Sequence, residues 1–456
     1  MVAMRRLAVS LLRWLAESLV RLYYPRRTVE GAAHIPPSGP ALYVANHPNG
    51  LLDPLVFRVC TGHPVRFLAK STLWGNPFGR LAMDAFGCLP VYRQQDVRVD
   101  ERGQTVTRNE ETFARCRAEL GAGAELALYP EGTSHSDPQL KPLKSGASRI
   151  ALSAAAEAAA APAEQNRRPL VLVPAGTWYE DKAIFRTGVH LILGPPIDLH
   201  QYLQTFGADQ RQAIDQLTAE IRGRLNELVL QAETSDLLAG IARVASWTAA
   251  DPQDDSPDRR RARTRELLEA YARLKETDPE RLEQVAQEAR RYARIIGRLG
   301  IRDPWAIEAP RLSFGDIALV LGRALVMLPV AAWGFITSWV PYRLAGVVSA
   351  RMTRDEDVLS TIKMIVGATF LAVAWTVEAV AIGCTFGLGW GLGSVVMAPA
   401  AGYAALRLGE TLRLVSEAVR HLGWRTRATT IRHLVDRRRR LADEVARALR
   451  AAGPAS

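Results

Sequence analysis

The sequence has few cysteines and no arrangement of them that would hold a metal or a disulfide framework. Its four cysteines, Cys60, Cys88, Cys116 and Cys384, lie far apart, with no CxxC pair and no His/Cys cluster. The zinc-protease pattern HExxH is also missing, so we expect no metal site. Disulfide frameworks are typical of secreted proteins, and their absence indicates a reducing compartment for most of the chain.

The N-terminus lacks an uncharged run of the ~20 residues that a membrane-spanning helix needs. Between Met4 and Tyr24, leucines recur at helical spacing and charged residues interrupt them. With Trp14 and several arginines, this pattern predicts that residues 1–30 form an amphipathic helix on a membrane surface. The alternative is a helix docked on the surface of the first domain.

The chain is rich in apolar residues and in positive charge. Its 456 residues are 48% hydrophobic, and 58 Lys and Arg against 47 Asp and Glu give a net charge of +11. This length favours two or three domains with a real core, and the charge indicates an anionic partner. The basic C-terminal segment has no interleaved aromatic residues and no nucleic-acid-binding motif, so we expect membrane lipids as partners and no nucleic acid.

Short apolar runs alternate with helical patterns between residues 31 and 207. The runs that predict strands are 41–45, 65–69, 87–92, 125–129, 170–174 and 190–194, and those that predict helices are 53–61, 76–85, 104–120 and 145–161. Such alternation predicts an α/β fold around a largely buried sheet.

The rest of the chain is predicted to be helical. We expect a charged helical region at 208–310, hydrophobic membrane hairpins at 311–410 and a basic helix at 411–456. The first apolar stretch, Ala324 to Tyr342, contains Pro329 and Pro341 and is expected to form a re-entrant or in-plane hairpin. The second, Met364 to Leu406, is expected to form two helices that turn at its glycines. The alternative is a water-soluble helical domain with an unusually apolar core.

A histidine and an aspartate follow the first predicted strand of the α/β region. His47 and Asp53 lie in the sequence VANHPNGLLDP, at a strand–loop junction where open α/β sheets usually place their sites. A histidine with a nearby carboxylate can act as a general base whose partner fixes its tautomer. The alternatives are a structural histidine and an aspartate that caps a helix ahead of Pro54.

Two further segments carry polar residues where a strand ends. Glu131 and Gly132 allow a tight turn whose backbone N–H groups, with the Thr133 hydroxyl, could hold a phosphate or an oxyanion. Arg93 ends the strand of residues 87–92 and could clamp a phosphate. The alternatives are a plain β-turn and a surface arginine.

These segments, in this order, resemble the glycerolipid acyltransferases. Four sequence blocks carry the resemblance, over roughly residues 35 to 200: Asn46-His47 with Asp53, Gly87 with Arg93, Tyr129-Pro130-Glu131-Gly132-Thr133, and Val171-Leu172-Val173-Pro174. The wording HPNGLLDP and PEGTSH is similar to the branch that contains the glycerol-3-phosphate and dihydroxyacetone-phosphate acyltransferases.

The sequence departs from the family pattern in two places. The histidine box is one residue longer than usual, and Gly50 could absorb the extra residue in a left-handed turn. The arginine that follows Glu-Gly-Thr in the family is replaced by Ser134-His135. Lys144 is a candidate to supply the missing positive charge.

The resemblance implies an O-acyltransferase of phospholipid synthesis. It implies His47 and Asp53 as catalytic residues, and Arg93, Glu131, Gly132, Thr133 and Lys144 as substrate-binding residues. No cofactor is expected, with acyl-CoA or acyl-carrier protein as co-substrate and glycerol 3-phosphate or a related glycerol phosphate as acceptor. The alternatives are acylation of 1-acylglycerol 3-phosphate or another lysolipid, and a catalytically silent lipid-binding protein. We expect a bacterial inner-membrane protein with its catalytic domain on the cytoplasmic face.

Overall fold

The computed structural model describes residues 2–92, 109–162, 168–250, 256–299, 314–425 and 428–453. The chain divides into two compact units. Unit 1 consists of Met1–Ser235 together with the short segment Asp355–Thr361, and unit 2 consists of Asp236–Arg354 and Ile362–Ser456.

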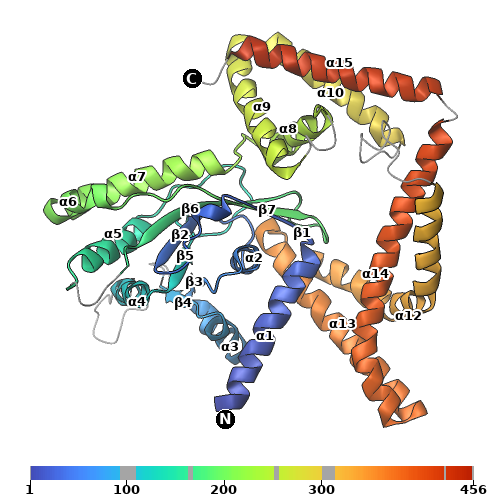
Figure 1. Ribbon diagram of the computed structural model, residues 1–456, viewed down its shortest axis with the longest axis horizontal. Helices are drawn as coiled ribbons and strands as arrows, with labels where there is room; N and C mark the ends of the chain where they lie inside the picture. Colours follow the sequence, from blue (N-terminus) through green and yellow to red (C-terminus); the bar gives the residue numbers. More distant parts are fainter. Residues whose placement is uncertain are drawn as a thin grey trace. The chain divides into compact units, whose positions relative to one another are not determined.

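Unit 1 is an α/β fold, as the alternation of apolar runs predicts. Its elements, shown in Figure 1, are α1 (Val2–Tyr23), β1 (Arg26–Glu30), η1 (Ala32–His34), β2 (Ala41–Ala45), α2 (Leu52–Thr61), β3 (Arg66–Lys70), η2 (Ser71–Trp74), α3 (Pro77–Ala85), β4 (Leu89–Val91), α4 (Asn109–Gly121), β5 (Glu125–Leu128), α5 (Gly146–Ala159), β6 (Val171–Tyr179), β7 (Gly188–Leu193), α6 (His200–Ala208) and α7 (Gln210–Leu228).

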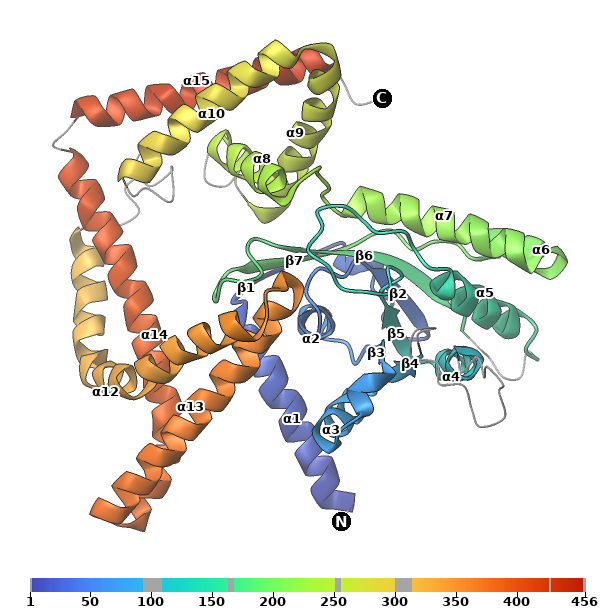
Figure 2. The ribbon, with the colours of Figure 1, turned by 180° about the vertical axis from the view of Figure 1, so that it is seen from behind.

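The seven strands in the described residues form one mixed sheet in the order β1-β7-β6-β2-β5-β3-β4. Strands β6, β2, β5, β3 and β4 run parallel, while β7 is antiparallel to β6 and carries β1 at the edge. Successive side chains of a strand point to opposite faces. In β2, Leu42 and Val44 therefore pack with α4, α5 and α7, whereas Tyr43 packs on the other face against Phe57 of α2. Figure 2 shows these helices on the two sides of the sheet.

All six predicted strands are present, and the structure adds a seventh. This strand is β1, with the sequence Arg-Arg-Thr-Val-Glu, and it falls inside the segment predicted as the N-terminal helix. The sequence did not reveal it because a five-residue edge strand with three charges has no apolar run. Its backbone pairs in register with β7, which supplies the hydrogen bonds that define it.

Helix α7 extends unit 1 beyond the boundary expected at residue 207. Its side chains Ala213, Leu217, Ile221 and Leu225 are buried in the same core cluster as β2 and β5. These positions follow the spacing of four and eight residues that places side chains on one helix face. The charged residues that suggested a separate helical region lie on the opposite, solvated face.

Helix α1 has features of both predicted alternatives, a helix docked on the first domain and an amphipathic helix on a membrane surface. Towards its C-terminal end Val20 and Tyr23 are buried, and the helix packs on α2 and α3. Towards its N-terminal end Leu7, Leu11 and Trp14 are exposed. The helix is thus docked on unit 1 at one end and presents an unpaired apolar face at the other.

All the secondary-structure elements described in unit 2 are helices. Its elements are α8 (Ser235–Trp247), α9 (Pro257–Thr277), α10 (Pro279–Leu299), α12 (Phe314–Met352), α13 (Glu356–Phe386), α14 (Leu388–Arg425) and α15 (Ala428–Ala452), of which α8 and α13 begin at residues grouped with unit 1.

The basic helix α15 packs on α9 and α10. Leu441 and Val445 of α15 lie in one buried cluster with Trp247 and Tyr292. The arginines expected to attract lipid are partly used inside the protein, because the buried Arg438 donates to the carbonyls of residues 247 and 249. The side chain of Arg437 forms an ion pair with Glu288.

The prediction that the first apolar stretch, residues 324–342, forms a hairpin is wrong. Residues 314–352 form the single helix α12, with Pro329 and Pro341 inside it, and Figure 2 shows the helix sharply bent. Proline removes one backbone hydrogen bond and kinks a helix without having to reverse the chain. Neighbouring helices in an apolar environment compensate for the lost bond, and here α14 packs closely enough that any side chain at Gly334 would clash with the Ala401 carbonyl.

The second apolar stretch forms two helices, as predicted. Helix α13 ends at Phe386 and α14 begins at Leu388, with Gly383 and Gly391 in contact across the break. Within the part of the chain that the structure describes, two helices are long and apolar enough to cross a membrane, Ala318–Met352 and Glu356–Phe386. Only 17% and 6% of their most apolar windows are buried in the structure, whereas a soluble core helix would be mostly buried.

Candidate active site

His47 and Asp53 meet at the carboxyl end of β2. The His47 Nδ1 lies 2.8 Å from the Asp53 Oδ2. The His47 side chain is 17% exposed and that of Asp53 is fully buried. A carboxylate on Nδ1 fixes the tautomer in which Nε2 carries the lone pair, so the second ring nitrogen is left to accept a proton from an incoming group.

The Asp53 carboxylate accepts two further hydrogen bonds. The Asn49 backbone N–H donates to Oδ2 at 2.8 Å, and the Tyr179 hydroxyl donates to Oδ1 at 2.5 Å. Asp53 lies inside the first turn of α2, whose N-cap is Leu51, so the helix-cap alternative does not hold. All three contacts come from donors, which suits an acceptor-only carboxylate.

Tyr179 was not recognised from the sequence. It is the last residue of β6, and β6 runs beyond the end of its neighbour β2, which places the tyrosine over Asp53. Burial, followed by the charge of Asp53, raises the pKa of Tyr179 well above its usual value. The hydroxyl therefore remains protonated and can always donate to Asp53. The strand predicted here ends at residue 174, so no sequence pattern placed Tyr179 at a strand end.

Tyr129 lies against the ring of His47. Its ring stacks on that of His47, with centroids 3.9 Å apart and planes 6° from parallel. Burial and the nearby Asp53 raise the pKa of Tyr129 well above its usual value. The stacked neutral ring restricts the imidazole to the plane in which Nδ1 meets Asp53.

Glu131 is tied to the protein through both carboxylate oxygens. The His47 backbone N–H donates to Oε1 at 3.0 Å, and the Lys141 N–H donates to Oε2 at 2.8 Å. The His135 Nε2 also contacts Oε2. The carboxylate is buried and bonded to protein donors, so its expected contact with substrate stays a prediction, while its contact with the His47 backbone is direct.

Gly132 and Lys144 lie together beside this carboxylate. The Gly132 N–H donates to the Tyr129 carbonyl at 3.0 Å and closes a turn, in which Gly132 has a left-handed φ of 71°. Lys144 lies over the turn so closely that a Cβ at Gly132 would be 2.6 Å from its Nζ. The structure therefore brings the ammonium of Lys144 to the turn where the family places an arginine.

The remaining expected residues are placed as follows. The Thr133 hydroxyl donates to the Ser134 carbonyl at 3.3 Å, next to the turn. Arg93 lies outside the described residues. Among the residues that the structure describes, no group of three His, Cys, Asp or Glu side chains is placed to hold a metal ion.

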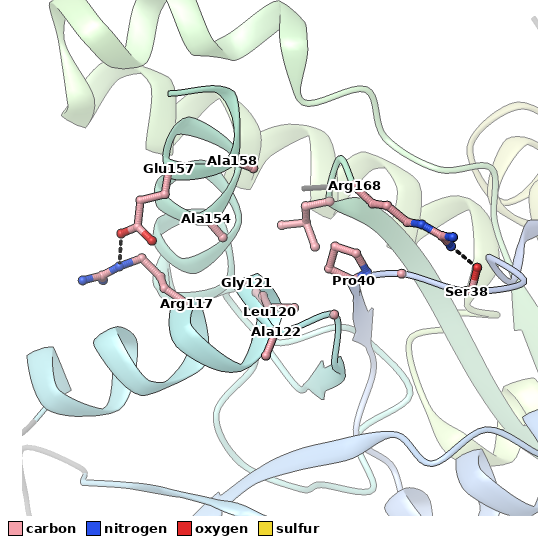
Figure 3. A pocket seen from close by; sticks show the side chains of 13 residues that line it. Ser38, Pro40, Arg117, Leu120, Gly121, Ala122, Ala154, Glu157, Ala158 and Arg168 are labelled. Carbon is pink, nitrogen blue, oxygen red and sulfur yellow. Dashed lines mark hydrogen bonds and ion pairs between the residues drawn. The ribbon is translucent and has the colours of Figure 1, made fainter. Parts of the chain in front are cut away.

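A cavity of about 400 Å³ lies at the amino ends of the strands, opposite the end that carries His47. It is lined by residues that precede β2, β5 and β6, among them Ser38, Gly123 and Leu170. Figure 3 shows Arg117 beside Glu157 on one side and Arg168 beside Ser38 on the other. Arg117 forms an ion pair with Glu157, Arg168 donates to the Ser38 hydroxyl, and neither His47 nor Asp53 lines the cavity.

Comparisons with known proteins match the part of the chain that contains His47 and Asp53. The acyltransferase family matches residues 26–177. A chloroplast 1-acyl-sn-glycerol-3-phosphate acyltransferase of Brassica napus is 30% identical over 139 residues, which are 30% of this chain and 36% of that protein. A 1-acyl-sn-glycerol-3-phosphate acyltransferase alpha of Ovis aries is 28% identical over 32% of this chain and 47% of that protein. The chain spans little more than a third of the length of the plant relatives it matches.

Two comparisons extend over more of the chain. An uncharacterized acyltransferase of Schizosaccharomyces pombe is 22% identical over 97% of this chain and 80% of its own length. The crystal structure of a 1-acyl-sn-glycerophosphate acyltransferase from Thermotoga maritima covers 48% of this chain and 80% of that one, with 17% identity and a TM-score of 0.32.

Proposed function

Residues 26–177 of this chain belong to the glycerolipid acyltransferase family, and on this premise we propose that the protein moves a fatty acyl group from a thioester to a glycerol phosphate. The donor would be acyl-CoA or acyl-carrier protein, and the acceptor a hydroxyl of glycerol 3-phosphate or a related glycerol phosphate. The observation that carries the proposal is the contact between the His47 Nδ1 and the Asp53 Oδ2 at 2.8 Å.

The proposed reaction needs a base but no nucleophile on the enzyme. The Nε2 of His47 takes the proton of the acceptor hydroxyl, and the Asp53 carboxylate balances the imidazolium that forms. The acceptor oxygen attacks the thioester carbonyl, the new C–O bond forms, and the C–S bond breaks. The imidazolium returns the proton to the leaving thiolate, which restores His47.

Lys144 and Gly132 supply the groups that suit an acceptor phosphate. The ammonium lies over a turn with a left-handed glycine, where a phosphate can approach the backbone closely. Lys144 acts there as a point charge in place of the family's arginine. Arg93 would add a second cation.

The names of the relatives favour a second acceptor. Both the Brassica napus and the Ovis aries proteins are named as 1-acyl-sn-glycerol-3-phosphate acyltransferases. An acceptor that already carries one acyl chain is therefore the alternative substrate. Both acceptors present a hydroxyl near a phosphate, so the same His47 chemistry serves either one.

We also propose that the protein works at a membrane, in phospholipid synthesis. The exposed apolar helices α12 and α13 support membrane association, and a site at the bilayer surface spares an acyl chain a passage through water. The exposed leucines of α1 suit the same surface. A bacterial inner membrane, with the site facing the cytoplasm, is the proposed location.

The test is an acyl-transfer assay with the purified full-length chain in phospholipid vesicles. Labelled acyl-CoA and acyl-carrier protein are supplied in turn with glycerol 3-phosphate, dihydroxyacetone phosphate, 1-acylglycerol 3-phosphate and lysophosphatidylcholine. We expect labelled product with a phosphomonoester acceptor. His47→Ala serves as the blank and should lower the rate by about 10²–10⁴-fold.

Two results would overturn the proposal. Product formation at the wild-type rate by folded His47→Ala protein would remove the base from the mechanism. A folded wild-type chain that forms no product with any donor and acceptor would instead favour the silent lipid-binding protein.

A further inference from the structure

The first turn of α13 is attached to the catalytic unit. Residues Asp355–Thr361 group with unit 1, although they lie more than a hundred residues beyond its other segment. We call this segment the α13 anchor. It begins a helix that is apolar and long enough to cross a membrane, and it contains two fully or almost fully buried hydroxyl residues, Ser360 and Thr361.

The anchor holds the loop between β6 and β7. The Ser360 hydroxyl donates to the Lys182 carbonyl at 2.5 Å, and the Tyr24 hydroxyl at the end of α1 donates to the same carbonyl at 2.9 Å. Two donors from distant parts of the chain therefore fix the backbone of Lys182. Because a buried carbonyl left without a donor is costly, this residue has one preferred position.

The side chain of Lys182 bridges the two catalytic loops. Its Nζ donates to the carbonyl of Pro48, next to His47, at 3.1 Å. It also donates to the Ser136 hydroxyl, beyond the glycine turn, at 2.6 Å. Burial lowers the pKa of Lys182, while the carboxylates of Glu356, Asp53 and Asp357 oppose that shift.

The anchor also contacts both loops directly. The Asp357 carboxylate is 2.5 Å from the Ser134 hydroxyl, which stands where the family has its arginine. A Cβ at Gly50 would be 2.9 Å from the Asp357 carbonyl oxygen, and Gly50 has a φ of 38°. The extra residue of the histidine box is thus a glycine where the anchor approaches the backbone.

We propose that the α13 anchor and Lys182 position the His47 loop against the glycine turn, so that a membrane helix sets the geometry of the acyl-transfer site. The proposal rests on the proposed function. Lys182 acts here as a positioning residue through Pro48 and Ser136. A general base must lie within hydrogen-bond reach of its proton, so loosening this bridge should lower kcat more than it changes KM.

The test compares variants of the full-length chain in the vesicle assay. Lys182→Met keeps the length of the side chain and removes its donors, Lys182→Arg keeps a donor, and Ser360→Ala removes one bond to the Lys182 carbonyl. We expect kcat to fall about tenfold in Lys182→Met, which loses two hydrogen bonds, and about threefold in Ser360→Ala, which loses one. Lys182→Arg should recover part of the loss, and KM should change by less than about twofold.

A matched control and a double variant separate positioning from folding. Ser148 is also fully buried and exchanges one hydrogen bond with Thr218 in the core of unit 1, so Ser148→Ala should keep the wild-type kcat. Because both residues act through one bridge, the double variant Lys182→Met with Ser360→Ala should lose little more than Lys182→Met alone.

The inference fails separately from the proposed function. If the wild-type chain transfers acyl groups while folded Lys182→Met and Ser360→Ala keep its kcat, the anchor does not position the site. Equal losses in Ser148→Ala and Ser360→Ala would also overturn it, because they would reflect a general loss of stability. If the wild-type chain forms no product, the proposed function itself has failed.

Discussion

Two groups of histidine, carboxylate and tyrosine lie at opposite edges of the sheet in unit 1. At the carboxyl end of β2, one oxygen of Asp53 lies 2.8 Å from the His47 Nδ1, and the other accepts a hydrogen bond from the Tyr179 hydroxyl at 2.5 Å. The second group lies where β5 begins. There one oxygen of Glu125 lies 2.7 Å from the His63 Nδ1, and the other accepts a hydrogen bond from the Tyr43 hydroxyl at 3.1 Å.

Each carboxylate has a histidine on one oxygen and a tyrosine hydroxyl on the other, and the two groups differ in what surrounds them. Asp53 is fully buried, Tyr129 and Glu131 contact its histidine, and Lys182 binds the carbonyl of the next residue, Pro48. Glu125 is partly exposed, and its histidine more so than His47. A histidine–carboxylate pair alone therefore does not identify a site. What distinguishes the carboxyl edge is the number of buried polar groups that several loops bring together there, which is typical of open α/β sheets.

The largest expected difference follows from removing the two carboxylates. Asp53→Ala should lower kcat by about 10²-fold or more, because His47 loses the partner that fixes its tautomer. Glu125→Ala should keep kcat within about twofold and reduce only thermal stability. Both are measured by acyl transfer and by the unfolding midpoint. If Glu125→Ala, while still folded, lost as much activity as Asp53→Ala, the two carboxylates would not differ in their role in acyl transfer.

The two tyrosines give a finer version of the same test. Tyr179→Phe removes one of three donors to Asp53 and should lower kcat about tenfold, the equivalent of one hydrogen bond to a charged group. Tyr43→Phe removes the matching donor to Glu125 and should leave kcat unchanged. A similar kcat for both variants would show that the third donor to Asp53 does not contribute to catalysis.

A third carboxylate, Glu180, has an arginine beside it as well as a histidine. Burial raises the pKa of Glu180, but His190, Arg26 and the Gly188 N–H outweigh it and hold the pKa at about 2, below the ordinary 4.5. Since the folded-state pKa is lowered, the stabilisation exists above pH 4.5 and is lost as the pH falls towards 2.

We therefore expect Glu180→Gln to destabilise the chain by about 1–3 kcal/mol at pH 7. The difference in unfolding midpoint from wild type should shrink between pH 4.5 and 2. A difference that stayed constant over this range would mean that the charge of Glu180 does not contribute.

The smallest effect is expected at the cavity. Arg168→Ala removes one of its two arginines, and acyl transfer should remain within about twofold of wild type, because the cavity opens at the edge away from His47. A change in KM for the acyl donor or the acceptor, at unchanged stability, would place substrate binding at the amino edge instead.

Much of the α/β unit could be predicted from local patterns. The six apolar runs became strands, because side-chain alternation and length decide such segments locally. The left-handed turn at Gly50 was also predictable, because the box holds one residue too many and glycine adopts that conformation at low cost. The bent α12 was not predicted, since proline in an apolar segment does not specify whether the chain bends or reverses.

The sequence by itself determined the alternation of strands and helices, the position of His47 and Asp53 at a strand end, and the apolar character of α12 to α14. The tertiary structure decided which side chains complete the site. Asp357 meets Ser134 across 223 residues of chain, and Tyr179 reaches Asp53 only because β6 runs past β2. Local sequence sets backbone preferences and the period of burial, whereas partners so distant in sequence are chosen by which loops the packed sheet brings to one edge.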